Sequence, residues 1–156
     1  MSFNNLDTLY RQVIMDHYKY PRNRGKLDNG ALTVEMNNPT CGDRISLQLQ
    51  IEDGIVKDVK FEGEGCSISM SSASMMTQAI KGQKIEDALQ MSALFSNMML
   101  GEEIDPGDLD LADIEALQGV SKFPARIKCA TLAWEAMEKG VKHEQSEQSE
   151  KVEDSK

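Results

Sequence analysis

The chain of 156 residues has little positive charge, few histidines and no long apolar run. No stretch approaches the roughly 18 apolar residues that a membrane-spanning helix needs, so we expect no membrane association. Lysine and arginine number 17 against 26 acids, and the net charge of −9 argues against a nucleic-acid-binding protein, because such proteins neutralise phosphates. The first residues lack the basic and apolar regions of a signal peptide, so we expect a cytoplasmic protein.

Cysteine is scarce as well, and its odd number argues against a framework of disulfides. In a reducing compartment the three thiols stay free to react or to bind a metal. The sequence contains no phosphate-binding glycine loop, dinucleotide-binding motif, HExxH zinc motif or nucleophile elbow. With only two histidines beside them, the three cysteines are therefore the first residues to consider for function.

Hydrophobic spacing predicts an α+β domain, in which a three-stranded antiparallel sheet packs against helices. The expected elements, in chain order, are a helix over 6–18, strands over 32–36, 45–51 and 55–62, and helices over 69–81, 85–100 and 125–141. Asp53-Gly54 predicts a tight hairpin turn between the second and third strands. Asp110 is expected to cap a short helix that contains Ile114 and Leu117.

The composition divides the chain at about residue 142. We expect residues 1–142 to form the folded domain and residues 143–156 to form an acidic disordered tail. The tail contains five acids, two lysines and one apolar residue, Val152. It cannot bury enough apolar surface to offset the entropy lost on ordering.

The three cysteines each lie near another group that bears on metal or sulfur chemistry. Cys41 and Asp43 are two residues apart in a loop predicted between two strands, so both can turn toward one metal ion. Cys66 follows a glycine at the start of a predicted helix, where the helix dipole favours negative charge. Arg126 precedes Cys129 by about one helical turn, and a guanidinium favours a thiolate. Together these residues can supply four ligands, and thiolates favour zinc or an iron–sulfur cluster.

Simpler interpretations remain open at this point. A lone cysteine is most often a small buried apolar residue, and the spacing matches no standard zinc-finger pattern. His17 lies on the apolar face of the first predicted helix, which makes it a fifth candidate ligand. A core histidine with satisfied hydrogen bonds is the expected role for it. The methionines of the predicted helices are interpreted as core residues.

The segments around the cysteines resemble the U-type iron–sulfur assembly proteins, the superfamily of IscU and the NifU N-terminal domain. The matching segments are 9–11, 16–17, 21–23, 38–43, 63–69 and 123–130. Lys128 stands where IscU-like scaffolds carry a histidine, and the chaperone-binding Leu-Pro-Pro-Val-Lys motif is absent. The chain between the second and third cysteines is extended. These three features are similar to the SufU branch of the superfamily.

The resemblance implies an IscU-like fold and a zinc-dependent sulfurtransferase. Such proteins accept persulfide sulfur from a PLP-dependent cysteine desulfurase of the SufS type and serve downstream cluster-assembly proteins. The resemblance further implies that Cys41, Asp43, Cys66 and Cys129 hold the zinc, that Cys41 accepts the sulfur, and that a desulfurase histidine replaces Cys41 on the metal. Arg126 is expected either to stabilise the thiolate or persulfide or to pair with a nearby acid.

Two other functions are consistent with the same residues. The protein can be a scaffold that assembles an iron–sulfur cluster on its cysteines. It can also be a non-catalytic adaptor, in which a structural zinc holds the fold and the protein activates the desulfurase.

Overall fold

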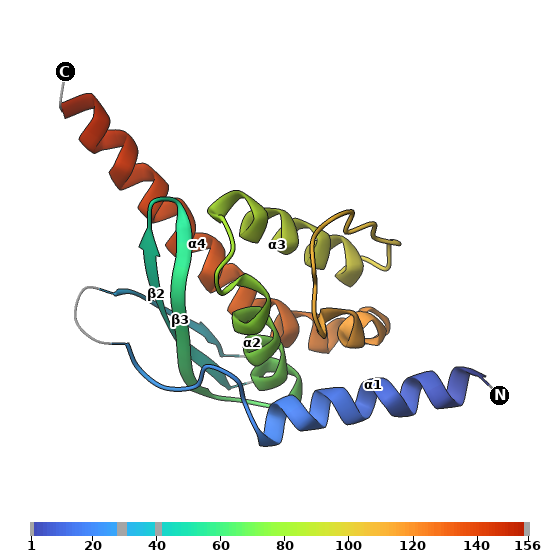
Figure 1. Ribbon diagram of the computed structural model, residues 1–156. Helices are drawn as coiled ribbons and strands as arrows, with labels where there is room; N and C mark the ends of the chain where they lie inside the picture. The colour runs from blue at the N-terminus through green and yellow to red at the C-terminus, as the bar shows by residue number, and fades with distance from the viewer. Residues whose placement is uncertain (1, 28–30, 40–41, 155–156) are drawn as a thin grey trace.

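A computed structural model of the protein describes residues 2–27, 31–39 and 42–154, with side chains described over 10–27, 31–39 and 42–145. The elements, in chain order, are α1 (Ser2–Lys19), β1 (Leu32–Asn38), β2 (Asp43–Glu52), β3 (Ile55–Glu64), α2 (Ser67–Ile80), α3 (Ile85–Met99), the 3₁₀ helix η1 (Ile114–Lys122) and α4 (Pro124–Asp154). This order confirms the predicted α+β class and the three-stranded sheet (Figure 1).

The sheet consists of two consecutive antiparallel hairpins in the order β1-β2-β3. Asp53 and Gly54 join β2 to β3, and both have positive φ angles, 53° and 74°, as a tight hairpin turn of this type requires. Asn38 is the register partner of Asp43, so the β1–β2 hairpin closes directly beside the segment predicted to bind metal.

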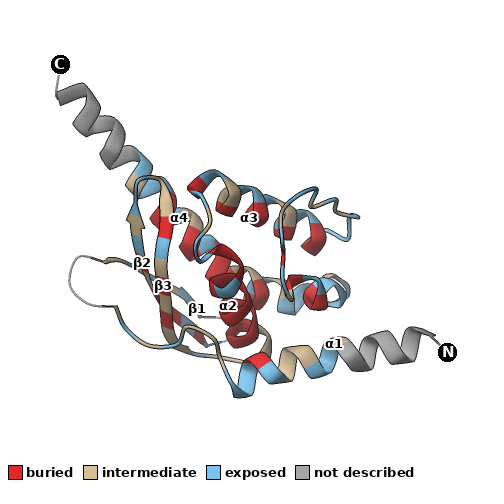
Figure 2. Ribbon diagram, viewed as in Figure 1, coloured by how far each residue is buried: buried red, intermediate tan, exposed pale blue. Residues whose placement is uncertain are grey.

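The core lies between the sheet and the helices, with α2 at its centre (Figure 2). Eleven of the fourteen residues of α2 are buried, because the helix packs against α1, α4 and β3. Its small polar side chains find partners inside the core. The hydroxyl of Ser72, for example, donates to the carbonyl oxygen of Ala130 in α4 at 2.6 Å. Helix α2 therefore contributes apolar packing and also buried serines that hydrogen-bond to neighbouring elements.

Helix α4 packs against β1 and β2, and a glycine allows the helix to approach these strands closely. A Cβ atom on Gly140 would lie 2.6 Å from Leu49 Cδ1 and 3.2 Å from Val34 Cγ2. Further along the core, the rings of Phe95 and Trp134 stack with their centroids 4.9 Å apart. The predicted core role of the helical methionines is confirmed, because Met75 and its neighbours in α2 and α3 are buried.

Apart from the start of η1 and the end of α4, the boundaries lie within four residues of the predicted ones. The short helix η1 begins after Asp113, and the predicted cap at Asp110 is wrong, because the Asp110 carboxylate accepts a bond from the main chain of Ala112 in a local turn. Helix α4 continues beyond the predicted end at residue 141 as far as Asp154, because glutamate, glutamine and lysine favour helix. The division of the chain into a domain over 1–142 and a tail over 143–156 stays a prediction.

The helices that the structure describes bear on the expected absence of membrane association. None of them combines the length and the apolar character that crossing a membrane requires.

Candidate metal centre

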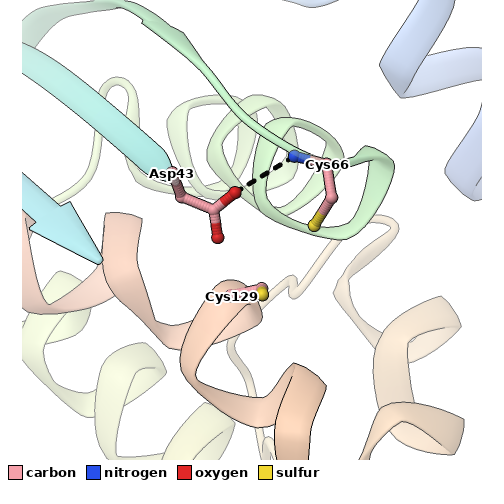
Figure 3. A group of neighbouring side chains, drawn as sticks. All are labelled: Asp43, Cys66 and Cys129. Atoms are coloured by element: carbon pink, nitrogen blue, oxygen red, sulfur yellow. Dashed lines mark hydrogen bonds between the residues drawn. The ribbon is translucent and has the colours of Figure 1, made fainter. Parts of the chain in front are cut away.

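Three of the four predicted metal ligands come together where the sheet meets two helices (Figure 3). Asp43 is the first residue of β2, Cys66 caps the N-terminus of α2, and Cys129 lies in the second turn of α4. Their ligand atoms all lie within 4.8 Å of one another. Cys41, the fourth predicted ligand, lies outside the described residues.

Asp43 is the most constrained member of this group. Its carboxylate is only 2% exposed, and Oδ1 accepts hydrogen bonds from the main-chain N–H of Cys66 and from the hydroxyl of Ser69, each at 3.1 Å. Oδ2 is also buried, yet it has no hydrogen-bond partner among the described residues. Figure 3 shows this oxygen pointing away from the Cys66 main chain, toward the sulfur atom of Cys129. A buried carboxylate oxygen without a donor is costly, so the arrangement is suited to a cation.

The approach of Cys66 to Asp43 depends on a glycine, Gly65. A Cβ atom on Gly65 would lie 2.5 Å from Asp43 Oδ1 and would also collide with the hydroxyl of Ser69. Because Gly65 has no Cβ atom, the start of α2 can bring its first main-chain N–H to the carboxylate. The glycine before the cysteine is therefore a structural requirement of the site.

Ser69 is the one residue of the site that sequence reasoning missed. Its hydroxyl lies 3.1 Å both from Asp43 Oδ1 and from the carbonyl oxygen of Cys66, so it ties the carboxylate to the first turn of α2. The signal was its position three residues after Cys66, because residues at this spacing share one face of a helix.

Cys129 and Arg126 form the opposite wall. Cys129 is fully buried, whereas Arg126, one turn earlier in α4, is exposed. The pKa of Arg126 is raised, first by the negative charge of the Cys66 thiolate, and then by a hydrogen bond to Cys129 and by the charge of that thiolate. The guanidinium therefore faces both sulfur atoms from the solvent side. This placement favours the expected interaction with thiolates over the alternative of an ion pair with an acid.

His17 does not belong to this group. Its ring is fully buried, Nδ1 lies 2.7 Å from the hydroxyl of Ser74, and Nε2 lies 2.8 Å from Asp113 Oδ2. Both ring nitrogens are engaged, so the ring keeps no free lone pair for a metal. The predicted core histidine with satisfied hydrogen bonds is confirmed.

The donor atoms fit a zinc ion. Two thiols and one carboxylate are ligands that zinc takes in tetrahedral sites, and the sulfur content disfavours magnesium and calcium. The partnerless Oδ2 of Asp43 is the independent observation, since a cation there would complete the bonding of a buried acceptor. The fourth position is open to Cys41, two residues before Asp43 in the sequence.

Comparison with known proteins agrees with this geometry. The NifU-like N-terminal domain family matches residues 9–130. The zinc-dependent sulfurtransferase SufU of Bacillus subtilis (strain 168) is 71% identical over 146 residues, which cover 93% of this chain and 98% of that protein. The iron–sulfur cluster assembly scaffold protein IscU of Streptococcus pyogenes serotype M1 is 46% identical, over 91% of this chain and 88% of that protein.

A solved structure extends the comparison to three dimensions. The crystal structure of a proposed iron–sulfur cluster assembly scaffold for the SUF system, from Fervidobacterium islandicum AW-1, superposes with a TM-score of 0.77 at 35% identity. The match covers 83% of this chain and 94% of that chain. Sequence, fold and the cysteine-carboxylate group thus agree, and the chain belongs to the family of NifU-like N-terminal domains.

Proposed function

We propose that this protein is a zinc-dependent sulfurtransferase of iron–sulfur cluster biogenesis, as its Bacillus subtilis relative is named. The observation that carries the proposal is the buried Oδ2 of Asp43, which has no partner among the described residues and belongs to a carboxylate that lies beside two thiols. Such a group is incomplete without a cation. The identity of 71% over nearly the whole length of that relative supports sulfur transfer as the use of the site.

Asp43, Cys66 and Cys129 are the proposed permanent ligands, with Cys41 as the fourth. A zinc ion bound there keeps its thiol ligands deprotonated near neutral pH. The three described ligands belong to β2, α2 and α4, so regular elements hold them in place. This support suits ligands that stay in position while a fourth residue reacts.

Cys41 is the proposed sulfur acceptor. Its thiolate attacks the terminal sulfur of a persulfide on a donor protein, and a new sulfur–sulfur bond forms on Cys41 while the donor's bond breaks. The donor cysteine leaves as a thiolate, so the exchange needs no external oxidant or reductant. Arg126 is the proposed second catalytic residue, because its exposed guanidinium faces the sulfur atoms and stabilises their negative charge.

The proposed donor is a PLP-dependent cysteine desulfurase of the SufS type, which forms a persulfide of this kind. The proposed recipients are downstream proteins of cluster assembly, in the cytoplasm. When Cys41 passes its outer sulfur to a recipient, Cys41 returns to a thiolate and the other zinc ligands keep their oxidation state. This suits a carrier that works repeatedly.

Mass spectrometry after mixing with desulfurase holoenzyme and cysteine tests the proposal. We expect about one zinc per purified chain and an adduct of about 32 Da on Cys41, the mass of one added sulfur atom. Cys41→Ala should remove the adduct. As a matched control, Cys41→Ala combined with Ser96→Cys restores the number of thiols at an exposed position of α3 and should stay without adduct.

Mass spectrometry and anaerobic reconstitution distinguish sulfur transfer from the two other candidate functions, the cluster scaffold and the zinc adaptor. The IscU relatives support the first of these, and the zinc ligands support the second. A scaffold would retain iron and sulfide after anaerobic reconstitution and would pass an intact cluster to an apo-protein. An adaptor would contain zinc and stimulate the desulfurase but would show no adduct on Cys41. Either result would replace sulfur transfer as the function of the site.

A further inference from the structure

The two edges of the sheet differ in how their main chain is bonded. Along β3, the N–H of Gly25 donates to the carbonyl oxygen of Phe61 at 2.9 Å, and the N–H of Phe61 donates to Asn23 at 3.0 Å. Further along the same edge, the N–H of Val56 donates to the carbonyl oxygen of Gln83 at 2.9 Å. Within residues 2–27, 31–39 and 42–154, β1 pairs only with β2 and its outer edge has no such cover. An open edge presents unpaired N–H and carbonyl groups to another chain.

A cavity of about 290 Å³ lies beside this open edge, between the end of β1 and one face of α4. The cavity is lined by Met36 and Asn38 from β1 and by Lys128, Thr131, Leu132 and Glu135 from α4. The helical residues recur every three or four positions, so they form one stripe along the helix. The cavity is therefore lined by apolar residues, Met36 and Leu132, together with polar ones.

Asn38 carries the strongest sign that this cavity takes a ligand. Its side chain is only 7% exposed, and Nδ2 is buried without a hydrogen-bond partner among the described residues. An unpaired buried donor costs more than the bond it could make, so a partner that supplies an acceptor is strongly favoured. The exposed ammonium group of Lys128 adds positive charge to the same wall. Glu135, the acid of the same wall, lies about two helical turns farther along α4, so donor and cation together select a carboxylate or an amide oxygen at the Lys128 end.

The cavity and the metal centre include neighbouring residues of the β1–β2 hairpin and of α4. Asn38 is the register partner of Asp43, and Lys128 directly precedes Cys129. A segment that lies along β1 and fills this cavity would thus run directly beside the proposed zinc ligands. That position suits the protein that delivers sulfur there.

We propose that the edge of β1 binds an extended segment of the sulfur donor as an additional strand, with a carboxylate or amide side chain in the cavity. Main-chain hydrogen bonds along the edge would supply affinity, and the cavity would supply specificity. The Nδ2 of Asn38 donates to the entering oxygen, and Lys128 pairs with its charge. The identity of the partner rests on the proposed function, whereas the docking surface rests on the geometry of β1 and α4.

Hydrogen exchange measured by mass spectrometry tests the docking surface. The protein is mixed with cysteine desulfurase holoenzyme in the absence of cysteine, so that no sulfur is transferred. We expect slower exchange over residues 32–38. Asn38→Leu and Lys128→Ala should each weaken binding roughly tenfold, because each removes one polar contact. Lys139→Ala, at an exposed position of α4 farther along the helix, is the matched control and should leave the Kd unchanged.

A docking role and a purely structural role for Asn38 predict different results for Asn38→Leu. Leucine at this position removes a buried donor that has no partner, so we expect Asn38→Leu to keep its Tm and its zinc content while it loses affinity. A lower Tm with unchanged Kd would overturn the role of Asn38 in docking.

The remaining outcomes separate this inference from the proposed function. Sulfur on Cys41 without any change of exchange over 32–38 would overturn the docking surface and leave sulfur transfer intact. Protection of 32–38 that rises with protein concentration alone, together with a dimeric native mass, would make a second copy the occupant and overturn the donor. Neither binding nor transfer with the holoenzyme would overturn both.

Discussion

Two polar clusters lie along α2, one at its first turn and one at its middle, and they differ in whether their buried polar atoms all have partners. At the N-terminal end, Ser69 helps to hold Asp43 beside Cys66, and one carboxylate oxygen has no partner among the described residues. At the middle of the helix, Ser74 bonds one ring nitrogen of His17 at 2.7 Å, and Asp113 bonds the other at 2.8 Å. We call the first the open cluster and the second the closed cluster.

The difference teaches that residue type alone does not identify a functional site. The closed cluster contains the serine, histidine and aspartate of a hydrolase triad, yet Ser74 is fully buried and also accepts a bond from the main-chain N–H of Arg22. It has no access to a substrate and braces α1 against α2 and η1. The open cluster, in contrast, has a buried acceptor that only an added group can satisfy. We therefore expect substitutions in the closed cluster to affect stability, and substitutions in the open cluster to affect metal binding.

The largest effect is expected in the closed cluster. His17→Ala removes the bonds from the imidazole to Ser74 and Asp113 and opens a cavity in the core, so the free energy of unfolding should fall by about 3 kcal/mol. Denaturant titration measures this change, and the zinc content of the folded protein should not change. Gln78→Ala, at an exposed position of α2, is the control and should stay within about 0.5 kcal/mol of the parent. Loss of zinc at unchanged stability would reverse the roles of the two clusters.

Within the open cluster, Asp43 should matter most. Asp43→Asn removes the negative charge from a nearly isosteric side chain, and zinc affinity should fall roughly a hundredfold, about 2.7 kcal/mol. Competition with a chromophoric chelator measures the affinity. Asp108→Asn, an exposed aspartate in the loop before η1, should leave it unchanged. Equal affinities of parent and Asp43→Asn would remove Asp43 from the ligand set.

Gly65 tests whether the open cluster depends on close approach. Gly65→Ala places a methyl group against the carboxylate of Asp43, so we expect a loss of about 2 kcal/mol in stability through overpacking, together with weaker zinc binding. Thermal unfolding with and without zinc measures both. Gly119→Ala is the control, because a Cβ atom there meets nothing within 4 Å. If both variants behave alike, the contact with the carboxylate is not what requires a glycine.

The smallest effect is expected from Ser69. Ser69→Ala removes one of the two donors to Asp43 Oδ1, which should cost about 1 kcal/mol, or roughly fivefold in zinc affinity. The chelator competition resolves a change of this size. Ser71→Ala removes a comparable local bond, to the carbonyl oxygen of Ile68, and should not alter zinc affinity. A larger effect at Ser71 would contradict the assignment of Ser69 to the site.

Much of the fold follows from local patterns. Alternating apolar residues predicted all three strands, because side chains alternate between the two faces of a strand. Asp53-Gly54 predicted the tight turn between β2 and β3, because that turn needs positive φ angles. The cap of η1 was not predictable in this way. Asp113 precedes the helix and bonds His17, 96 residues earlier in the chain, and no local pattern records such a contact.

The candidate site shows the same division. Cys66, Cys129 and Asp43 were identified from their neighbours in the sequence, and the motifs around them resemble one superfamily. Ser69 was missed, because its spacing of three residues from Cys66 shows that the two share a helix face but does not show the contact of Ser69 with Asp43. The open edge of β1 was not predicted either, since cover of an edge depends on which segments pass it in space.

The sequence by itself determined the elements, the family and the residue types of the metal centre, because these depend on spacing and on side-chain chemistry. Only the tertiary structure decided which polar atoms are satisfied. His17 and Asp43 are both buried, yet the packing of α1, α2 and η1 gives His17 two partners, whereas the junction of β2, α2 and α4 leaves Asp43 Oδ2 without one among the described residues. Hydrogen bonds act over about 3 Å, so their completion is set by the folded geometry and not by order along the chain.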